Sequence, residues 1–166
     1  SVRELCSAVS RECSKYGYEP VMLTDQLCCQ AKEAGSFLAS IAKTHCKSGK
    51  KLAYIAGGET IVNITGHGKG GRNQEIALSA AEGIKGMPNA AVFSIGSDGT
   101  DGPTDAAGGY SDGDTAGVLK NKGIDIFEVL KNNDAYNALK LTEGLIITGP
   151  TGTNVNDVAV LLIDCD

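Results

Sequence analysis

Length, composition and charge narrow the class of protein before any motif is considered. The chain has 166 residues, 42% of them hydrophobic and 21% charged, which is ordinary for a folded domain and excludes a disordered chain. The net charge of −5 excludes a basic stripe for a nucleic-acid backbone. No apolar run approaches the roughly 18 residues of a membrane helix. We therefore expect one domain, residues 1–166, with no nucleic-acid or membrane partner.

Residues 1–50 predict two helices around one strand, which we interpret as a lead-in to a motif-bearing core at residues 51–166. Apolar residues recur at helical spacing over residues 2–16 and again over residues 28–46. Between these helices, residues 20–24 have the composition of a short buried strand.

The core alternates between strand-like and helix-like segments. Strands are predicted at residues 52–56, 60–65 and 91–95, and a helix at residues 73–85. Two or three short helices follow at residues 114–121, 126–131 and 135–140, and residues 145–148 and 158–163 predict a closing strand pair. Helices that alternate with apolar strands predict an α/β protein, a three-layer α/β/α fold with a mixed, mostly parallel sheet.

The six cysteines lack the pattern of a disulfide framework. The sequence contains no Cys-x-x-Cys, and most cysteines fall on helix-like segments; Cys6 and Cys13 share one apolar face. This distribution favours reduced thiols in a cytoplasmic protein.

Three glycine-rich loops follow strand-like runs and carry most of the functional signal: residues 57–59 with residues 66–75, residues 96–105, and residues 148–157. Glycine has no Cβ, so backbone amides can converge on an anion, and a helix start adds partial positive charge. Ligands of α/β sheets gather at the carboxyl ends of strands, where these loops fall. The loops predict a phosphate or carboxylate site.

The first loop matches the dinucleotide fingerprint, with Gly66, Gly68 and Gly71 between a strand and a helix. The acidic residue that would hold a ribose is poorly placed, and a dinucleotide loop does not need the flanking Lys69 and Arg72. Cations beside a helix N-terminus fit a terminal phosphate or a substrate carboxylate better. A nicotinamide site and a structural turn remain alternatives.

The second loop brings Asp98, Asp101 and Asp105 close together, but their spacing lacks the order of a twelve-residue calcium loop. Asp-Gly pairs also make turns, so a structural role stays open beside the orientation of a substrate hydroxyl or contact with a nucleotide-bound magnesium ion. We predict no protein metal site. Glu59 is either a base or a local cap, and Asn154 either binds a ligand or braces a hairpin.

Several enzyme classes are not supported by the residues. The chain has no Walker-type loop, and its two histidines form no persuasive nucleophile–base arrangement.

Taken in order, four motifs resemble the carboxy-terminal MOFRL domain of the glycerate 2-kinases, which are also labelled hydroxypyruvate reductases. They are Gly-Gly-Glu-Thr at 57–60, Gly-Gly-Arg-Asn-Gln-Glu at 70–75, Asp-Gly-Thr-Asp-Gly-Pro-Thr-Asp-Ala-Ala-Gly at 98–108 and Thr-Gly-Pro-Thr-Gly-Thr-Asn-Val-Asn-Asp at 148–157. The resemblance covers essentially the whole chain. Where the family commonly places basic residues, this chain has Thr65 and His67, which leaves Lys69 and Arg72 as the cations of the loop.

The resemblance implies a two-domain enzyme that reacts glycerate with ATP in the cleft between its domains to form 2-phosphoglycerate. The upstream nucleotide-binding domain, absent from this chain, would hold most of the Mg²⁺ and ATP, so we expect the chain alone to be inactive. The implied catalytic residues are Arg72, Glu59 and Asp98. The implied substrate- or phosphate-binding residues are Gly57, Gly58, Lys69, Gly70, Gly71, Asn73, Asp101 and Asn154.

In our mechanistic hypothesis, Arg72 holds the transferring phosphate or the glycerate carboxylate. Glu59 or an aspartate of the second loop then orients the attacking hydroxyl. An NAD(P)H-dependent hydroxypyruvate reductase, a non-catalytic ligand-binding module and a structural lid for the missing domain remain alternatives. The residues leave the oligomeric state open, a homo-oligomer included.

Overall fold

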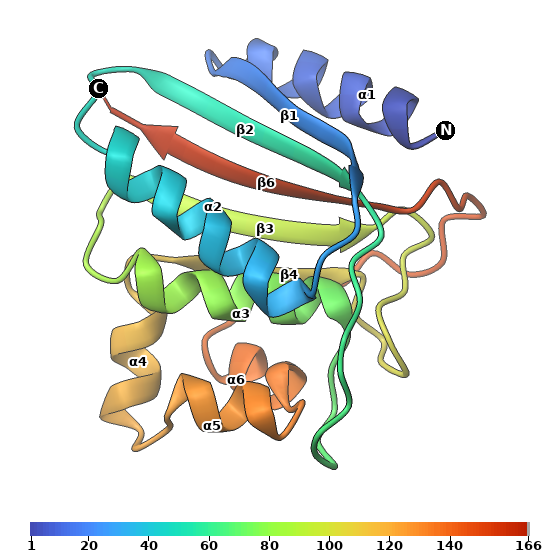
Figure 1. The fold of residues 1–166 in the computed structure, drawn as a ribbon, viewed down its shortest axis with the longest axis vertical. Coiled ribbons are helices and arrows are strands. Elements are labelled where there is room, and N and C mark those ends of the chain that lie inside the picture. Colours follow the sequence, from blue (N-terminus) through green and yellow to red (C-terminus); the bar gives the residue numbers. More distant parts are fainter. Residues whose placement is uncertain (166) are drawn as a thin grey trace.

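A computed structural model describes residues 1–165, which form a six-stranded sheet in the order β1-β2-β6-β3-β4-β5 with helices on both faces (Figure 1). Helix α1 (Val2–Lys15) lies on one face, and α2 (Ala31–His45) and α3 (Arg72–Gly83) lie on the other. The predicted α/β class and the three layers are confirmed.

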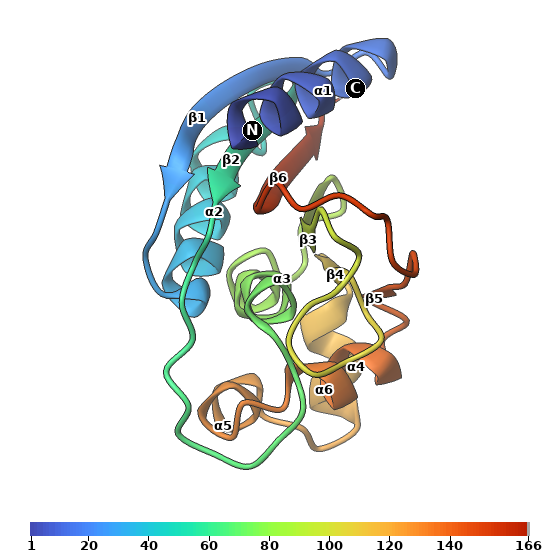
Figure 2. The same cartoon turned by 90° about the vertical axis from the view of Figure 1, so that its right-hand side faces the viewer.

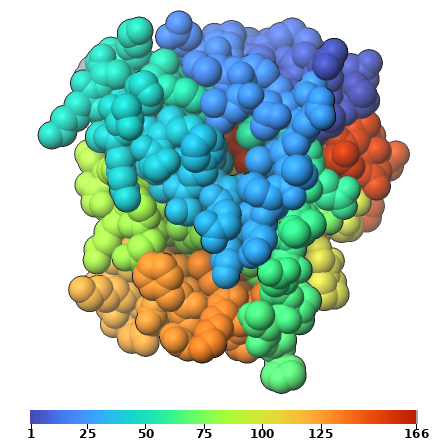
Figure 3. Space-filling view, in the orientation of Figure 1, coloured from blue at the N-terminus to red at the C-terminus, as the bar shows by residue number. Residues whose placement is uncertain are grey.

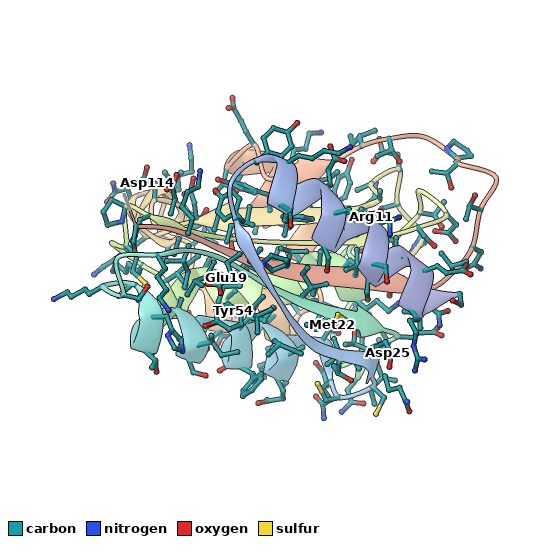
Figure 4. The ribbon with its side chains drawn as sticks, turned by 90° about the horizontal axis from the view of Figure 1, so that it is seen from above. Arg11, Glu19, Met22, Asp25, Tyr54 and Asp114 are labelled. Atoms are coloured by element: carbon teal, nitrogen blue, oxygen red, sulfur yellow. The ribbon has the colours of Figure 1, made fainter. Side chains whose placement is uncertain are left out.

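Helix α1 forms where its sequence predicts it. Ser1 caps the helix through a capping box with Glu4, and the helix buries Cys6 against the sheet residues Ile55 and Val158. Figure 4 looks down on this helix and shows Glu19, Met22 and Asp25 along the neighbouring strand β1 (Glu19–Leu27). Arg3 Nε donates to Asp25 Oδ2 at 2.8 Å and joins α1 to that strand.

Strand β1 is longer and more exposed than residues 20–24 predict, so the expectation of a short buried strand is wrong. It lies at the edge of the sheet, pairs in parallel with β2 (Lys51–Gly58) and has no fully buried residue. The apolar side chains of β1 therefore lie at the edge of the sheet and not within the hydrophobic core.

The predicted mostly parallel sheet is also wrong, because β1–β2 is the one parallel pair among the named strands. Strands β2 and β3 (Ala90–Gly96) run in the same direction, as a connection through α3 requires. Strand β6 (Asp157–Asp164) inserts between them in the opposite direction and pairs with both. Six of its eight residues are buried, which matches its continuous apolar sequence.

Two further strand predictions are wrong. Residues 60–65 contribute a single bridge, Gln30 to Ile61, and are otherwise irregular. Residues 145–148 and 158–163 do not pair with each other, because β5 (Leu145–Ile146) pairs with β4 (Gly108–Asp112).

Strand β4 is not predicted from the sequence, because it begins with two glycines, which are uncommon in strands. A Cβ at Gly109 would lie 2.6 Å from Leu139 Cδ1 and 3.2 Å from Ala77 Cβ, so helices pack closely on this strand where it has no side chain.

Helix α3 is buried on two sides. One side packs on the sheet with α2, and the other packs on a block made of α4 (Thr115–Asn121), α5 (Ile126–Lys131) and α6 (Ala135–Leu141). Figure 3 shows this block beneath α2, with the loop of residues 59–71 running down beside it. The predicted helices at residues 73–85, 114–121, 126–131 and 135–140 are confirmed, and packing on both sides fixes where the N-terminus of α3 lies.

Candidate functional site

The three glycine-rich loops meet at one end of the sheet because Asp157, the first residue of β6, pairs with the last residues of both neighbouring strands. Its register partners are Gly58 on β2 and Gly96 on β3. The loops that leave β2 and β3 therefore lie beside the loop that enters β6. Figure 2 looks onto the N-terminal end of α3 and shows these loops around it.

Arg72 links two of these loops from the first position of α3. Its Nε donates to Asp157 Oδ2 at 2.5 Å, its Nη2 donates to Asp157 Oδ1 at 3.3 Å, and its Nη1 lies 3.3 Å from Glu59 Oε1. The side chain of Asp157 is 8% exposed, whereas those of Arg72 and Glu59 are 36% and 56% exposed. The hydrogen bond that Arg72 donates to Asp157 is the main cause that raises the pKa of Arg72 above its ordinary value. The guanidinium is thus tethered on one edge by a buried carboxylate and touched on the other by an exposed one.

A groove of about 440 Å³ lies between the loop of residues 59–71 and α3. Its polar lining residues are Glu59, Thr60, Arg72, Glu75 and Asn133, and Ile61, Val62, Ile64 and Pro103 contribute apolar walls. A concave, mainly apolar site with a few polar groups is typical of small-ligand binding.

The N-terminus of α3 is capped by the protein's own carboxylate. Asp101 accepts hydrogen bonds from the amides of Asn73 and Gln74 at 3.0 and 2.9 Å, and from their side-chain nitrogens at 3.1 and 2.9 Å. Asp101 is only 3% exposed, and its burial raises its pKa. These amides are therefore satisfied internally and do not face an anion.

Asn73 and Asp101 consequently lie behind the groove rather than within it. Asn73 is fully buried, and its Oδ1 accepts a hydrogen bond from Ser94 Oγ at 2.6 Å. Gly71 has to be glycine, because a Cβ there would lie 2.5 Å from Asp101 Cγ. Together these residues fix the start of α3, and with it the position of Arg72.

The backbone amides of residues 65–69, in the glycine-rich loop, also donate hydrogen bonds to protein oxygens. Those of Thr65 and Gly66 donate to Asn133 Oδ1 at 2.7 and 2.9 Å. The next three amides bond to neighbouring positions of the same α5–α6 connection: His67 to Asn132 Oδ1, Gly68 to Asn132 O, and Lys69 to Asp134 Oδ1. The expectation that these amides converge on an anion is wrong for residues 65–69, since each already has an acceptor.

The remaining predicted residues lie around this centre. Lys69 Nζ lies 4.0 Å from the centroid of the Tyr136 ring, a cation–π contact. Gly57 and Gly58 are buried at the end of β2, Gly70 and Gly71 line the groove, and Asn154 is exposed in the third loop, where its Oδ1 accepts a hydrogen bond from the Asn156 amide at 3.4 Å.

Asp98 is half-buried and lies near the carboxylate that holds Arg72. A Cβ built at Gly96 would lie 3.2 Å from Asp98 Oδ1 and 3.4 Å from Asp157 Oδ1, so both carboxylates flank this glycine. Asp98 Oδ1 also accepts a hydrogen bond from the Thr100 amide at 3.0 Å, which closes a turn. The third loop braces the second, since Val155 N donates to Ser97 Oγ at 2.7 Å.

The predicted site omits Asp157, Glu75 and Asn133. Asp157 closes the fourth motif, and Glu75 closes the second, three residues after Arg72 and therefore on the same face of the helix. Those two positions were visible in the sequence. The partners of Asn133 were not, because its contacts reach Asn63, Thr65 and Gly66, at least 67 residues away.

Within residues 1–165, no group of three or more His, Cys, Asp or Glu side chains is arranged to hold a metal ion. In the same residues, no helix has both the length and the apolar character that a membrane crossing requires. All six cysteines are free thiols.

The fold and the site define an α/β domain that presents a tethered arginine beside a groove of small-ligand size. The model of the MOFRL family matches residues 52–157. The chain therefore belongs to the MOFRL family, and the resemblance carried by its four motifs is confirmed.

Named relatives show a consistent likeness. The chain is 50% identical over 167 residues to D-glycerate 2-kinase of Thermotoga maritima, covering 98% of this chain and 40% of that protein. It is 45% identical over 163 residues to glycerate 2-kinase of Pyrococcus horikoshii, covering 95% and 37%. The crystal structure of a glycerate kinase from Thermotoga maritima matches with a TM-score of 0.94 and 49% identity, over 99% of this chain and 41% of that one. The chain thus spans about two fifths of the length of these relatives.

Proposed function

We propose that this chain is the C-terminal part of an ATP-dependent glycerate 2-kinase, and that it forms one wall of an active site between two domains. The names of its relatives support the activity, and its coverage of about two fifths of their length supports a second domain. The observation that carries the proposal is Arg72, a partly exposed guanidinium held beside a groove by Asp157. We place the enzyme in the cytoplasm, in keeping with the free thiols.

Arg72 supplies charge compensation in this mechanism. Phosphoryl transfer asks a protein mainly to position the reactants and to stabilise charge on the transferring phosphate. Asp157 fixes one edge of the guanidinium, so the donors on its other edge hold the glycerate carboxylate or the phosphate bidentately. Asn73 and Asp101 position Arg72 by anchoring the first turn of α3.

Glu59 has two roles in succession. In the free domain it lies 3.3 Å from Arg72 Nη1, and such an exposed ion pair contributes only about 0–1 kcal/mol. An anionic substrate can therefore displace Glu59 from Arg72 at little cost. The released carboxylate then orients the attacking hydroxyl of glycerate, a task for which Asp98 is the second candidate. Phosphorylation of the 2-hydroxyl gives 2-phosphoglycerate.

Mg²⁺ bound to ATP would supply charge shielding for the phosphates. In this proposal the other domain would hold most of the Mg²⁺–nucleotide complex. On this side of the cleft, the carboxylates of Asp98 and Glu59 are the groups that can meet it.

The nicotinamide-dependent reductase gains no support from the loop geometry. A dinucleotide needs loop and helix amides that are open to its pyrophosphate. Here the amides of residues 65–69 and of Asn73 and Gln74 already donate to protein oxygens.

The test is an assay of the full-length, two-domain protein with glycerate and ATP, with ³¹P NMR to identify the product. We expect 2-phosphoglycerate, and no turnover from the 166-residue chain alone. Parallel incubation with hydroxypyruvate and NADH is the control for the reductase. Consumption of NADH without phosphorylation of glycerate contradicts the proposal, and formation of 3-phosphoglycerate contradicts the stated product.

A further inference from the structure

We propose that Glu75 is a substrate-contacting residue that recognises a hydroxyl group of the bound acid. The inference rests on the proposed function, because it assumes that the groove beside Arg72 takes a small hydroxy acid. It assigns the two ends of the ligand to two residues of one helix: the carboxylate to Arg72, and a hydroxyl to Glu75.

The first observation is the placement of Glu75. It follows Arg72 by three positions on α3, so both side chains leave the same face of the helix, and both line the groove. Glu75 is 4% exposed, whereas a glutamate without a partner or a function is almost always solvated. A carboxylate buried in the wall of a groove calls for a compensating donor.

The second observation is that the protein supplies a donor to one oxygen only. Asn133 Nδ2 donates to Glu75 Oε2 at 3.1 Å, and among residues 1–165 no protein donor contacts Oε1. Oε1 is not one of the buried side-chain atoms that lack a partner, so it remains accessible from the groove that Glu75 lines. A ligand hydroxyl in the groove is the donor that would complete this carboxylate.

The third observation is that the orientation of Glu75 is fixed. Asn133 Oδ1 accepts from the amides of Thr65 and Gly66, and its Nδ2 donates to Asn63 O as well as to Glu75. Because the amide oxygen already faces two backbone N–H groups, its NH₂ end must face Glu75. Oε2 is thereby committed to Asn133, and Oε1 remains for the ligand.

The surroundings favour selectivity for a hydroxyl. The side chains of Ile61, Val62 and Pro103 in the groove walls offer a ligand hydroxyl no hydrogen bond. A site that hydrogen-bonds a substrate hydroxyl strongly rejects analogues without it, because its buried polar group is then left unpaired. A single hydrogen bond to a charged acceptor corresponds to a discrimination of about 10- to 100-fold.

The experiment uses the two-domain enzyme and three competitive inhibitors of glycerate phosphorylation: lactate, which has the 2-hydroxyl; 3-hydroxypropanoate, which has the 3-hydroxyl; and propanoate, which has neither. The wild-type enzyme should bind at least one hydroxylated acid about 10- to 100-fold more tightly than propanoate. Glu75→Gln should lose at least about tenfold of that preference while its inhibition by propanoate stays the same.

Two further variants separate the roles. Arg72→Ala should weaken all three acids by a similar factor, because each has the carboxylate. Glu82→Gln, an exposed glutamate on the same helix, should behave as wild type and controls for the loss of one charge. Thermal unfolding of each variant controls for folding.

The outcomes are distinct. Loss of the hydroxyl preference in Glu75→Gln with unchanged propanoate inhibition supports the inference. Retention of the preference, or equal weakening of all three acids, overturns it and leaves the kinase proposal intact. If the wild-type enzyme neither phosphorylates glycerate nor binds any of the acids, both proposals fail. Should Glu75→Gln not fold, the wild-type complex with glycerate decides: a hydroxyl within hydrogen-bond distance of Oε1 supports the inference, and any other pose overturns it.

Discussion

Arg72, the first residue of α3, and Asp157, the first residue of β6, form a two-point hydrogen-bonded pair although they lie 85 positions apart, with Nε–Oδ2 and Nη2–Oδ1 distances of 2.5 and 3.3 Å. The pair joins the start of a buried helix to the start of the central strand. It therefore serves the fold and the orientation of the guanidinium at once, and the two roles can be separated by mutation.

Asp157→Asn removes the charge of the buried partner and should destabilise the protein by about 1–3 kcal/mol, because Arg72 loses a charge-assisted hydrogen bond. Glu59→Gln is the matched control. Its ion pair with Arg72 is exposed, so its loss should change stability by no more than about 1 kcal/mol. Urea unfolding measures both. Equal losses for the two variants would show that burial does not distinguish the two carboxylates.

Arg72→Ala in the two-domain enzyme should lower kcat by about 10³-fold or more, since a compensating arginine contributes about 10³–10⁵ in related phosphoryl transfers. Arg72→Lys keeps the charge but loses the planar fork, so its rate should fall between wild type and Arg72→Ala. Steady-state kinetics with glycerate and ATP measure the order. Near-normal turnover of Arg72→Ala would remove this residue from the mechanism.

Asp101→Ala leaves buried donors of Asn73 and Gln74 without an acceptor and should destabilise the protein by about 3 kcal/mol or more. Asp125→Ala is the comparison, because Asp125 is an exposed cap that accepts one hydrogen bond, from the Phe127 amide, and should cost about 1 kcal/mol. Chemical denaturation gives the difference. A smaller loss for Asp101→Ala than for Asp125→Ala would refute the anchoring role.

Helix α3 and the position of Arg72 at its start could be predicted from sequence, because the apolar period is strong and the glycines mark the N-terminus. The role of Asp101 could not, since it caps a helix 27 and 28 residues away in sequence. The sequence of β6 is apolar and predicts a strand, but its local pattern does not indicate that the strand inserts between β2 and β3. Residues 60–65 have the β-branched alternation of a strand, yet the Ile61 amide donates to Cys29 O and the Thr65 amide donates to the side chain of Asn133. The local sequence pattern predicts most helices and strands. Polar contacts between residues far apart in the sequence determine the conformation and the hydrogen bonding of the loops.

The raised pKa of Glu75 predicts how the stability of a Glu75 variant relative to wild type changes with pH. Burial, above all, raises its pKa above the ordinary 4.5, and Asp101 adds to the shift, while Asn133 and Lys32 oppose it. A carboxyl with a raised folded-state pKa contributes stability that is fully present below the unfolded-state value and is lost as pH rises through the folded-state value. Glu75→Gln mimics the protonated form at every pH. Its stability relative to wild type should therefore increase as pH rises from about 4 to 7.

The measurement is the urea midpoint of both proteins at several pH values in that range. Glu82→Gln again serves as the control, because Glu82 is exposed on the same helix and should show little pH-dependent difference from wild type. A difference between Glu75→Gln and wild type that stays constant with pH, or that moves the other way, would contradict the predicted direction of the shift.

Hydrogen exchange tests whether the glycine-rich loop is held by the protein or is open to ligands. The amides of Thr65 and Gly66 donate to Asn133, a residue with a left-handed φ of 55°, so Asn133→Gly keeps the backbone conformation but removes the acceptor. These amides should then exchange at least about tenfold faster, because they lose their hydrogen bonds and open locally. The Asn73 and Gln74 amides, capped by Asp101, should stay protected in the same variant.

In the wild-type protein, addition of inorganic phosphate should leave exchange at residues 65–69 unchanged, since a ligand that contacts Arg72 need not touch amides that already have acceptors. Strong protection of these amides by phosphate would show that the loop opens to cradle the anion itself.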